Sequence, residues 1–301
     1  WGIYATSGGG NVYVAPVGTV TGNEGIYAGT TAGGTVDVVA TSAIKGTTLN
    51  GINTSSGAGQ ITISNAVSSE GQLSGIVAES GSGPILITGA GSATGTTEYG
   101  ILARSSGTAS IDVLSTGTVT GGKSGVVAVS LGTGNVNVSG TGTTLGSNGW
   151  GIYATSGGGN VYVAPVGTVT GSEGIYAGTT AAGTVDVVAT SAITGNTLAG
   201  INTSSGAGKI SISNAVSSTG QTSGIVAESG SGDIAITGAG SATGTTEYGI
   251  LARSGGAGTV DVLTTGTVTG GKAGVIAMSL GVGNVNVLGT GNTLGSNGWG
   301  I

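Results

Sequence analysis

The acidic side chains that could do chemistry in this sequence recur at matched places. Asp37, Asp112, Asp186 and Asp261 each stand between two β-branched residues, as in the run Val36–Val38. Two carboxylates a few ångströms apart could act as the acid and base of sugar hydrolysis, and a cluster of carboxylates could bind Ca²⁺. Whether these aspartates meet depends on the elements that carry them.

Those elements repeat on two nested scales, and the repeats must be recognised before secondary structure is assigned. Residues 2–150 and 151–299 align without a gap and differ at 23 positions, while residues 300–301 begin a third copy. Within each block, a Gly followed by Ile or Val recurs every 23 to 26 residues, which divides the chain into twelve units. Residues 1–301 therefore form one continuous array. We expect its ends either to continue into further repeats or to be joints where identical modules meet head to tail.

Each unit contains three short strands separated by turns. In the first unit these strands are Gly2–Ala5, Asn11–Val14 and Thr19–Thr21, and in the third unit the last strand is Ala66–Ser68. Val, Ile and Thr favour strands, and the many glycines favour turns. Segments of four to six such residues have neither the length nor the periodicity of a helix.

Alternation along these strands gives every unit one apolar face. Val36 and Val38 point to one side of their strand, and Asp37 points to the other. A unit of this size cannot bury its apolar face alone, but coils stacked about 4.8 Å apart bury it continuously and pair equivalent strands. The sequence therefore predicts an all-β fold: a parallel β-solenoid of twelve coils, with about 25 residues and three short strands per coil.

This stacking separates the aspartates. Asp37 and Asp112 belong to coils three steps apart, so their carboxylates lie about 14 Å from each other. That distance is too long for shared catalysis, and we expect these aspartates to be solvated surface charges. Asp233 occurs only in the second block, where the first block has Pro84. The sequence thus predicts no catalytic, cofactor-binding or metal-binding residue, and no enzyme activity.

Other motifs give weaker signals. The run after Gly33 resembles part of a Ca²⁺-binding nonapeptide but lacks its second glycine. Thr19 and Thr21 resemble the Thr pairs of ice-binding solenoids, but Ala43 and Lys45 interrupt the ladder in the next coil. A net charge of −6 with only six Lys and Arg argues against nucleic-acid binding. No apolar run of about 18 residues predicts a membrane-spanning helix.

Opposite charges stack in neighbouring coils of the predicted register. Exposed pairs of this kind contribute only about 0–1 kcal/mol, so they support the register more than the stability. The predicted pairs are Glu79 with Arg104, Glu98 with Lys123, Glu228 with Arg253, and Glu247 with Lys272.

The outward column of the first strand is mostly apolar. So long an apolar stripe is unusual on a monomer surface and indicates lateral contact between copies or contact with a ligand. The alternative is that flanking turns cover the stripe or that scattered apolar residues are tolerated there. We refer to the following ten residues as the outer column: Tyr4, Tyr27, Val77, Leu102, Val127, Tyr153, Tyr176, Val226, Leu251 and Ile276.

Repeats built on GIYA, GIVAES, GILARS and TVTG resemble the β-helical passenger regions of bacterial autotransporters and filamentous-haemagglutinin-like surface proteins. The resemblance covers the whole chain and is one of composition and periodicity. It implies a right-handed β-helix, export through a Gram-negative outer membrane, and a location on the cell surface or outside the cell.

Together, the repeats and this resemblance favour a structural segment of a long surface or extracellular protein, forming a stiff rod, stalk or filament. Its expected partners are further copies of itself, joined end to end or bundled. An adhesin that binds surface glycans through its outward columns is the alternative, and a polysaccharide-cleaving enzyme is less favoured.

Overall fold

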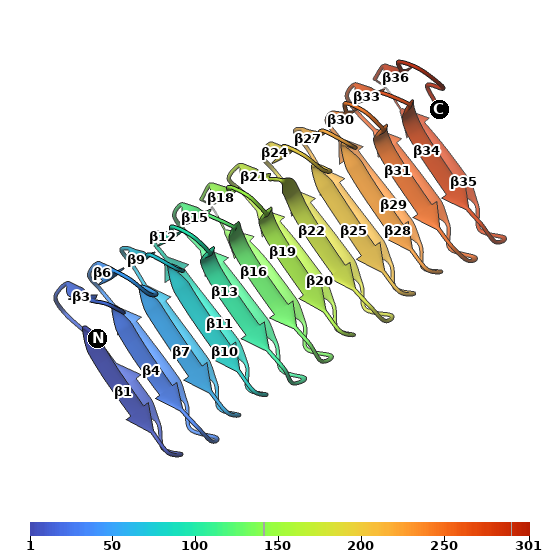
Figure 1. The fold of residues 1–301 in the computed structure, drawn as a ribbon. Coiled ribbons are helices and arrows are strands. Elements are labelled where there is room, and N and C mark those ends of the chain that lie inside the picture. The colour runs from blue at the N-terminus through green and yellow to red at the C-terminus, as the bar shows by residue number, and fades with distance from the viewer. Residues whose placement is uncertain (141, 290) are drawn as a thin grey trace.

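The chain forms a rod of stacked coils, seen along its length in Figure 1. The structure, a computed structural model, describes residues 1–140, 142–289 and 291–301. Each coil gives one strand to each of three parallel twelve-stranded sheets, and the described residues contain no helix. The predicted fold class is confirmed: an all-β parallel solenoid of twelve coils with about 25 residues per coil.

The first sheet contains the longest strands, because the Gly-Ile-x-Ala segments at the start of each coil alternate cleanly between core and surface. Its strands, in spatial order, are β1 (Ile3–Ser7), β4 (Ile26–Thr30), β7 (Ile52–Ser56), β10 (Ile76–Ser80), β13 (Tyr99–Ser105), β16 (Ser124–Ser130), β19 (Trp150–Ser156), β22 (Glu173–Thr179), β25 (Ile201–Ser205), β28 (Ile225–Ser229), β31 (Tyr248–Ser254) and β34 (Ala273–Ser279).

The second sheet carries the aspartates on its outer face. Its strands are β2 (Val12–Val14), β5 (Val36–Ala40), β8 (Ile61–Asn65), β11 (Ile85–Ala90), β14 (Ile111–Ser115), β17 (Val136–Gly140), β20 (Val161–Pro165), β23 (Val185–Ala189), β26 (Ile210–Asn214), β29 (Ile234–Ala239), β32 (Val260–Thr264) and β35 (Val285–Gly289).

The third sheet consists of three-residue strands that each end at a glycine. These strands are β3 (Val20–Gly22), β6 (Ile44–Gly46), β9 (Ser69–Gly71), β12 (Ala93–Gly95), β15 (Val119–Gly121), β18 (Thr144–Gly146), β21 (Val169–Gly171), β24 (Ile193–Gly195), β27 (Ser218–Gly220), β30 (Ala242–Gly244), β33 (Val268–Gly270) and β36 (Thr293–Gly295).

One prediction about the third sheet is wrong. The sequence assigned a strand to Ala66–Ser68, whereas β9 begins at Ser69 and the side chain of Val67 is exposed in the turn before it. Ser69 takes the inward place because its hydroxyl donates a 2.8 Å hydrogen bond to the carbonyl oxygen of Gly75. Gly71 aligns with the strand-ending glycines of the neighbouring coils, and this glycine fixes the register.

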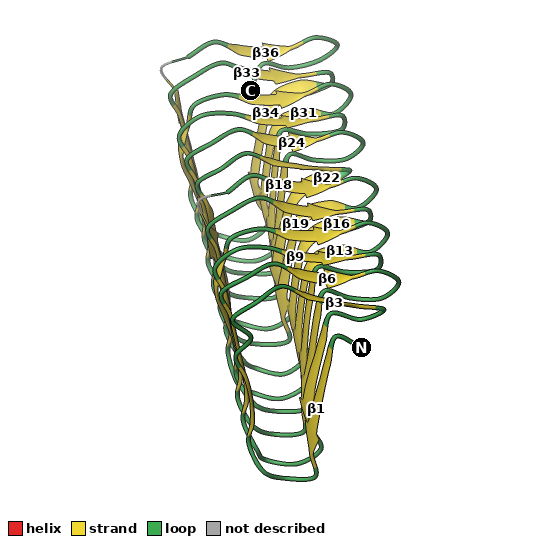
Figure 2. Cartoon of the chain, turned by 90° about the vertical axis from the view of Figure 1, so that its left-hand side faces the viewer, coloured by secondary structure: helices red, strands yellow, loops and turns green. Residues whose placement is uncertain are grey.

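The inner faces of the three sheets enclose one continuous apolar core. Ile26, Ile52 and Ile76 form one column of this core, and each is fully buried beside the same residue type in the next coil. Figure 2 shows the coils stacked one above another with their connecting turns at the corners. Since every inner coil lies between two others, its apolar stripe is covered on both sides.

Glycines at the corners are required mainly by the neighbouring coil. A Cβ atom on Gly117 would lie 1.1 Å from the carbonyl oxygen of Gly91, and one on Gly142 would lie 1.4 Å from that of Gly117. Left-handed φ angles explain only Gly89 and Gly238 among the described glycines, at 60° and 62°. The abundance of glycine therefore reflects close stacking of backbone on backbone more than the conformation of turns.

Candidate functional site

The outer column is a row of long and short side chains along the first sheet, in register from coil to coil except where Asn53 and Asn202 take its place in the third and ninth coils. It is partly covered: Val77 and Val127 are only 8% and 9% exposed, whereas Tyr4 is 56% exposed. Adjacent members cover one another, so the column is uneven rather than flat.

Aromatic side chains in this column are stacked at the junction between the two blocks. The rings of Tyr153 and Tyr176 lie 5.2 Å apart between centroids and 12° from parallel. Trp150 packs against Tyr153 at 4.6 Å with a tilt of 50°. The same arrangement occurs at the start of the first block, in Trp1, Tyr4 and Tyr27. Each block therefore begins with an aromatic cluster on the outer face.

A buried carboxylate supports the aromatic cluster at the junction. Glu173 Oε2 accepts a 2.9 Å hydrogen bond from Trp150 Nε1, and its Oε1 accepts one of 2.8 Å from Asn202 Nδ2. Glu173 is 5% exposed, and its burial raises the pKa of the carboxyl group. In the first block, Glu24 accepts hydrogen bonds from the side chains of Asn50 and Asn53.

Sequence reasoning missed these glutamates. Their positions in the sequence could have indicated these hydrogen bonds. Glu24 and Glu173 each come directly before the glycine that begins a coil, and the equivalent position of a neighbouring coil holds a Trp or an Asn. Asn202, by contrast, comes from a different column, and only the structure brings its amide to Glu173.

A second contact fixes the ring of Tyr176. Its hydroxyl and the Ser204 hydroxyl share a hydrogen bond of 3.0 Å. A Cβ atom on Gly178 would lie 3.2 Å from Tyr176 Cε1 and 2.8 Å from Ser204 Oγ. The absence of a side chain at Gly178 therefore leaves room for the ring to lie along the strand.

The structure brings all four predicted charge pairs within ion-pair distance. The nitrogen-to-oxygen distances are 3.9 Å for Arg104 with Glu79, 3.6 Å for Lys123 with Glu98, 3.0 Å for Arg253 with Glu228, and 2.6 Å for Lys272 with Glu247. These side chains are about half exposed, so each pair contributes at most about 1 kcal/mol.

Two of the lysines are held in their charged form. Contact with Tyr99, and then with Glu98, raises the pKa of Lys123, whose Nζ lies 5.4 Å from the centre of the Tyr99 ring. A hydrogen bond to Glu247 raises the pKa of Lys272.

A fifth ion pair was not predicted. Lys45 Nζ lies 3.7 Å from Glu70 Oε2, because β9 places Glu70 directly beside Lys45. The sequence prediction placed the third strand of this coil at Ala66–Ser68, so it did not align Glu70 with Lys45. In the second block both members are replaced together, by Thr194 and Thr219, which are also neighbours in register.

The aspartates of the second sheet do not meet. Thr62 and Leu86 lie between Asp37 and Asp112 in the register of the sheet. Asn137 donates a hydrogen bond to Asp112, and Asn286 donates one to Asp261; each asparagine lies in the coil that follows its aspartate. Within the described part of the chain, no three His, Cys, Asp or Glu residues are grouped as metal ligands would be. Asp112 and Asp261 therefore each have a neutral hydrogen-bond partner one coil away.

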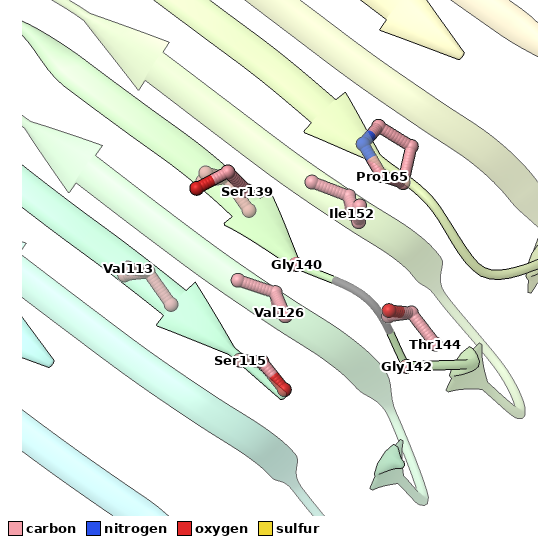
Figure 3. A pocket seen from close by; sticks show the side chains of 10 residues that line it. Val113, Ser115, Val126, Ser139, Gly140, Gly142, Thr144, Ile152 and Pro165 are labelled. Atoms are coloured by element: carbon pink, nitrogen blue, oxygen red, sulfur yellow. The ribbon is translucent and has the colours of Figure 1, made fainter. Parts of the chain in front are cut away.

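Two hollows differ in character. One is an interior void of about 10 Å³ beside Val126, Gly140 and Ile152, with room for about one water molecule. Figure 3 shows the side chains that line it. A groove of about 320 Å³ lies on the outer face beside Tyr153 and Tyr176. The groove, and not the void, has the size and access of a binding site.

The described residues include no helix that is long and apolar enough to cross a membrane. No protein-family model, curated protein or solved structure matches this chain. Functional arguments therefore depend on the solenoid and on the surfaces that it presents.

Proposed function

We propose that this chain is a structural segment of a long bacterial surface or extracellular protein, in which it forms a stiff rod, stalk or filament. The observation that carries the proposal is the continuity of all three sheets across the junction of the two blocks. There β16 pairs with β19, β17 with β20, and β18 with β21, in the same in-register manner as coils inside a block. One block therefore adds length without changing the path of the rod.

Stiffness is supported by the way each coil is held. Backbone hydrogen bonds join every inner coil to the coils on both sides, and the apolar core passes through without interruption. Bending such a rod would strain hydrogen bonds in three sheets at once. Six coils per block give an axial advance of about 29 Å.

A location on the surface of a Gram-negative cell, or outside it, is part of this proposal. Its support is the resemblance of the repeats to autotransporter and filamentous-haemagglutinin-like passenger regions. In this proposal the chain is not an enzyme, and its partners are further copies of itself, arranged end to end or side by side.

Electron cryotomography of the source cells, combined with subtomogram averaging, tests the proposal. We expect rods with a coil spacing of about 4.8 Å that extend beyond one block. Deletion of residues 151–299 from the gene should shorten each rod by about 29 Å and leave its width unchanged. Compact particles whose length does not respond to the deletion would contradict a rod.

The same images separate the two forms of the proposal. Continuous rods in lateral bundles would identify a filament, and separate stalks ending in a different domain would identify a spacer.

A further inference from the structure

The tall ring of Tyr153 stands beside a much shorter side chain in the preceding coil. In register, Tyr153 has Tyr176 on one side and Val127 on the other. The two tyrosine rings are nearly parallel, and their 5.2 Å separation is close to the coil spacing of about 4.8 Å. Tyr176 therefore stacks on one side of Tyr153 along the rod, and the shorter Val127 lies in register on the other side.

A groove of about 320 Å³ lies beside these two rings and reaches from the sixth coil to the ninth. Val129 and Leu131 line it from the sixth coil, Tyr153 and Thr155 from the seventh, Tyr176 and Thr180 from the eighth, and Ser204 from the ninth. None of the described residues that line the groove is charged. Its volume falls at the small end of the range for small-molecule sites, about 300–1,000 Å³.

The aromatic wall of the groove is fixed before any ligand arrives. Trp150 packs against the ring of Tyr153, with a centroid distance of 4.6 Å and a tilt of 50°, and is itself hydrogen-bonded to the buried carboxylate of Glu173. The ring of Tyr176, which also lines the groove, is held by a hydrogen bond to Ser204 and lies beside Gly178, where there is no side chain. A preformed wall reduces the entropy that a ligand loses on binding.

We propose that this groove binds the pyranose ring of a neutral saccharide. A pyranose in which most hydroxyls are equatorial has an apolar C–H face that fits against an aromatic ring, while its hydroxyls point outward from the rim. In the groove, the rings of Tyr153 and Tyr176 with Val129 and Leu131 supply the apolar surface, and Thr155 and Thr180 supply hydroxyl partners.

The composition of the groove argues against other occupants. An acidic sugar or a nucleotide would bring a negative charge to a groove whose described lining has no cation. A second copy of the chain would need about 800 Å² of contact on each partner, yet Val77 and Val127 of the outer column are already buried.

Because the blocks repeat along the rod, the groove would recur at a fixed spacing. The groove lies beside the junction between residues 150 and 151, and each further block in an array would add another about 29 Å along the rod. Weak single sites at fixed spacing would bind a polysaccharide tightly through avidity. The inference concerns a binding site and would add to the rod function without being needed for it.

Fluorescence of Trp150 provides the test. The full chain is prepared with Trp1→Phe and Trp299→Phe, so that Trp150 is the sole indole, and is titrated with cellotriose, chitotriose and, as the acidic comparison, trigalacturonate. We expect a saturable change with at least one neutral trisaccharide. Tyr153→Ala should weaken that binding about tenfold or more, and Tyr153→Phe should keep it within about threefold.

Tyr162→Ala is the matched control, because Tyr162 lies in the same coil but on the outer face of the second sheet. It should leave the saccharide affinity unchanged, and circular dichroism should show the same β signal in all variants. The proposal is overturned if neither neutral trisaccharide gives a saturable response, if trigalacturonate binds more tightly, or if both alanine variants weaken binding equally. Self-association that Tyr153→Ala abolishes, without a saccharide response, would assign the groove to a second copy and also overturn it.

Discussion

Replacing Gly117 by alanine should damage the rod at one corner. Gly117 lies between β14 and β15, and an added Cβ would lie 1.1 Å from the carbonyl oxygen of Gly91. Ordinary van der Waals contact begins at 3.4 Å, so the atoms must separate by more than 2 Å. The obstacle is backbone, which cannot rotate away as a flexible side chain would. Either the corner leaves its neighbour or the coils move apart.

The cost follows from the contacts at that corner. The backbone amides of Thr116 and Gly117 both donate 3.0 Å hydrogen bonds to the carbonyl oxygen of Ala90. Losing these two bonds, together with overpacking in a close-packed region, should lower the free energy of unfolding by about 2–5 kcal/mol.

Hydrogen exchange followed by mass spectrometry is the suitable assay, because repeat arrays can open locally. In Gly117→Ala, peptides covering residues 85–120 should exchange faster, while peptides covering 234–269 should keep wild-type protection. The latter contain Gly266, which occupies the matching corner of the second block and remains unchanged.

Gly18→Ala is the matched control, since no heavy atom lies within 4 Å of the Cβ position at Gly18. This variant should be neutral or slightly more stable, by up to about 1 kcal/mol. The steric explanation is refuted if Gly117→Ala retains wild-type protection at residues 85–120. It is equally refuted if Gly18→Ala is destabilised to the same extent.

Three further changes test the core, the junction and the fifth ion pair. Ile212→Ala, at a fully buried site, should cost about 2–5 kcal/mol in urea denaturation, and a loss below 1 kcal/mol would contradict continuous packing. Burial raises the pKa of the Glu173 carboxyl group above 4.5. The contribution of this group to the free energy of unfolding is therefore complete below pH 4.5, and it is lost as the pH rises through the raised pKa of the folded state. Glu173→Gln should therefore gain thermal stability relative to wild type between pH 4 and pH 7; a constant difference would refute this assignment. Replacing Lys45 and Glu70 together by Thr, as in the second block, should change the free energy of unfolding by less than about 1 kcal/mol. The difference between the variant and wild type should become smaller in high salt. A larger loss, or one independent of salt, would show that the pair is more than a surface contact.

The fold could be predicted because the sequence shows both of its periods: the alternation of residues along each strand and the spacing of about 25 residues between coils. Alternation placed Val36 and Val38 inside and Asp37 towards the surface, and the 25-residue spacing placed Glu79 beside Arg104. Neither inference needs a side-chain conformation.

The third strand of the third coil could not be placed by hydropathy. Val67 looked like a core residue, but Ser69 is buried because its hydroxyl finds a backbone acceptor inside the rod. A polar residue that satisfies its own hydrogen bond can replace an aliphatic one, and a hydropathy pattern does not record that partner.

The junction site was only partly visible in the sequence. Tyr153 and Tyr176 were placed in the outer column, but the groove beside them joins residues of four coils, and only the structure shows how their side chains enclose it. The buried contact between Glu173 and Asn202 joins two different columns, and the spacing of residues along one strand contains no sign of it.

The stacked ion pairs have a consequence for how the rod folds. If a coil docked one step out of place, Glu79 would lose Arg104, and Glu98 would lose Lys123. A displacement by a whole block instead offers the same partners again, in Arg253 and Lys272. These charges therefore guard against small slips but not against a jump of 149 residues, which would loop out six coils. Sequential folding from one end, each finished coil serving as the template for the next, would avoid that error.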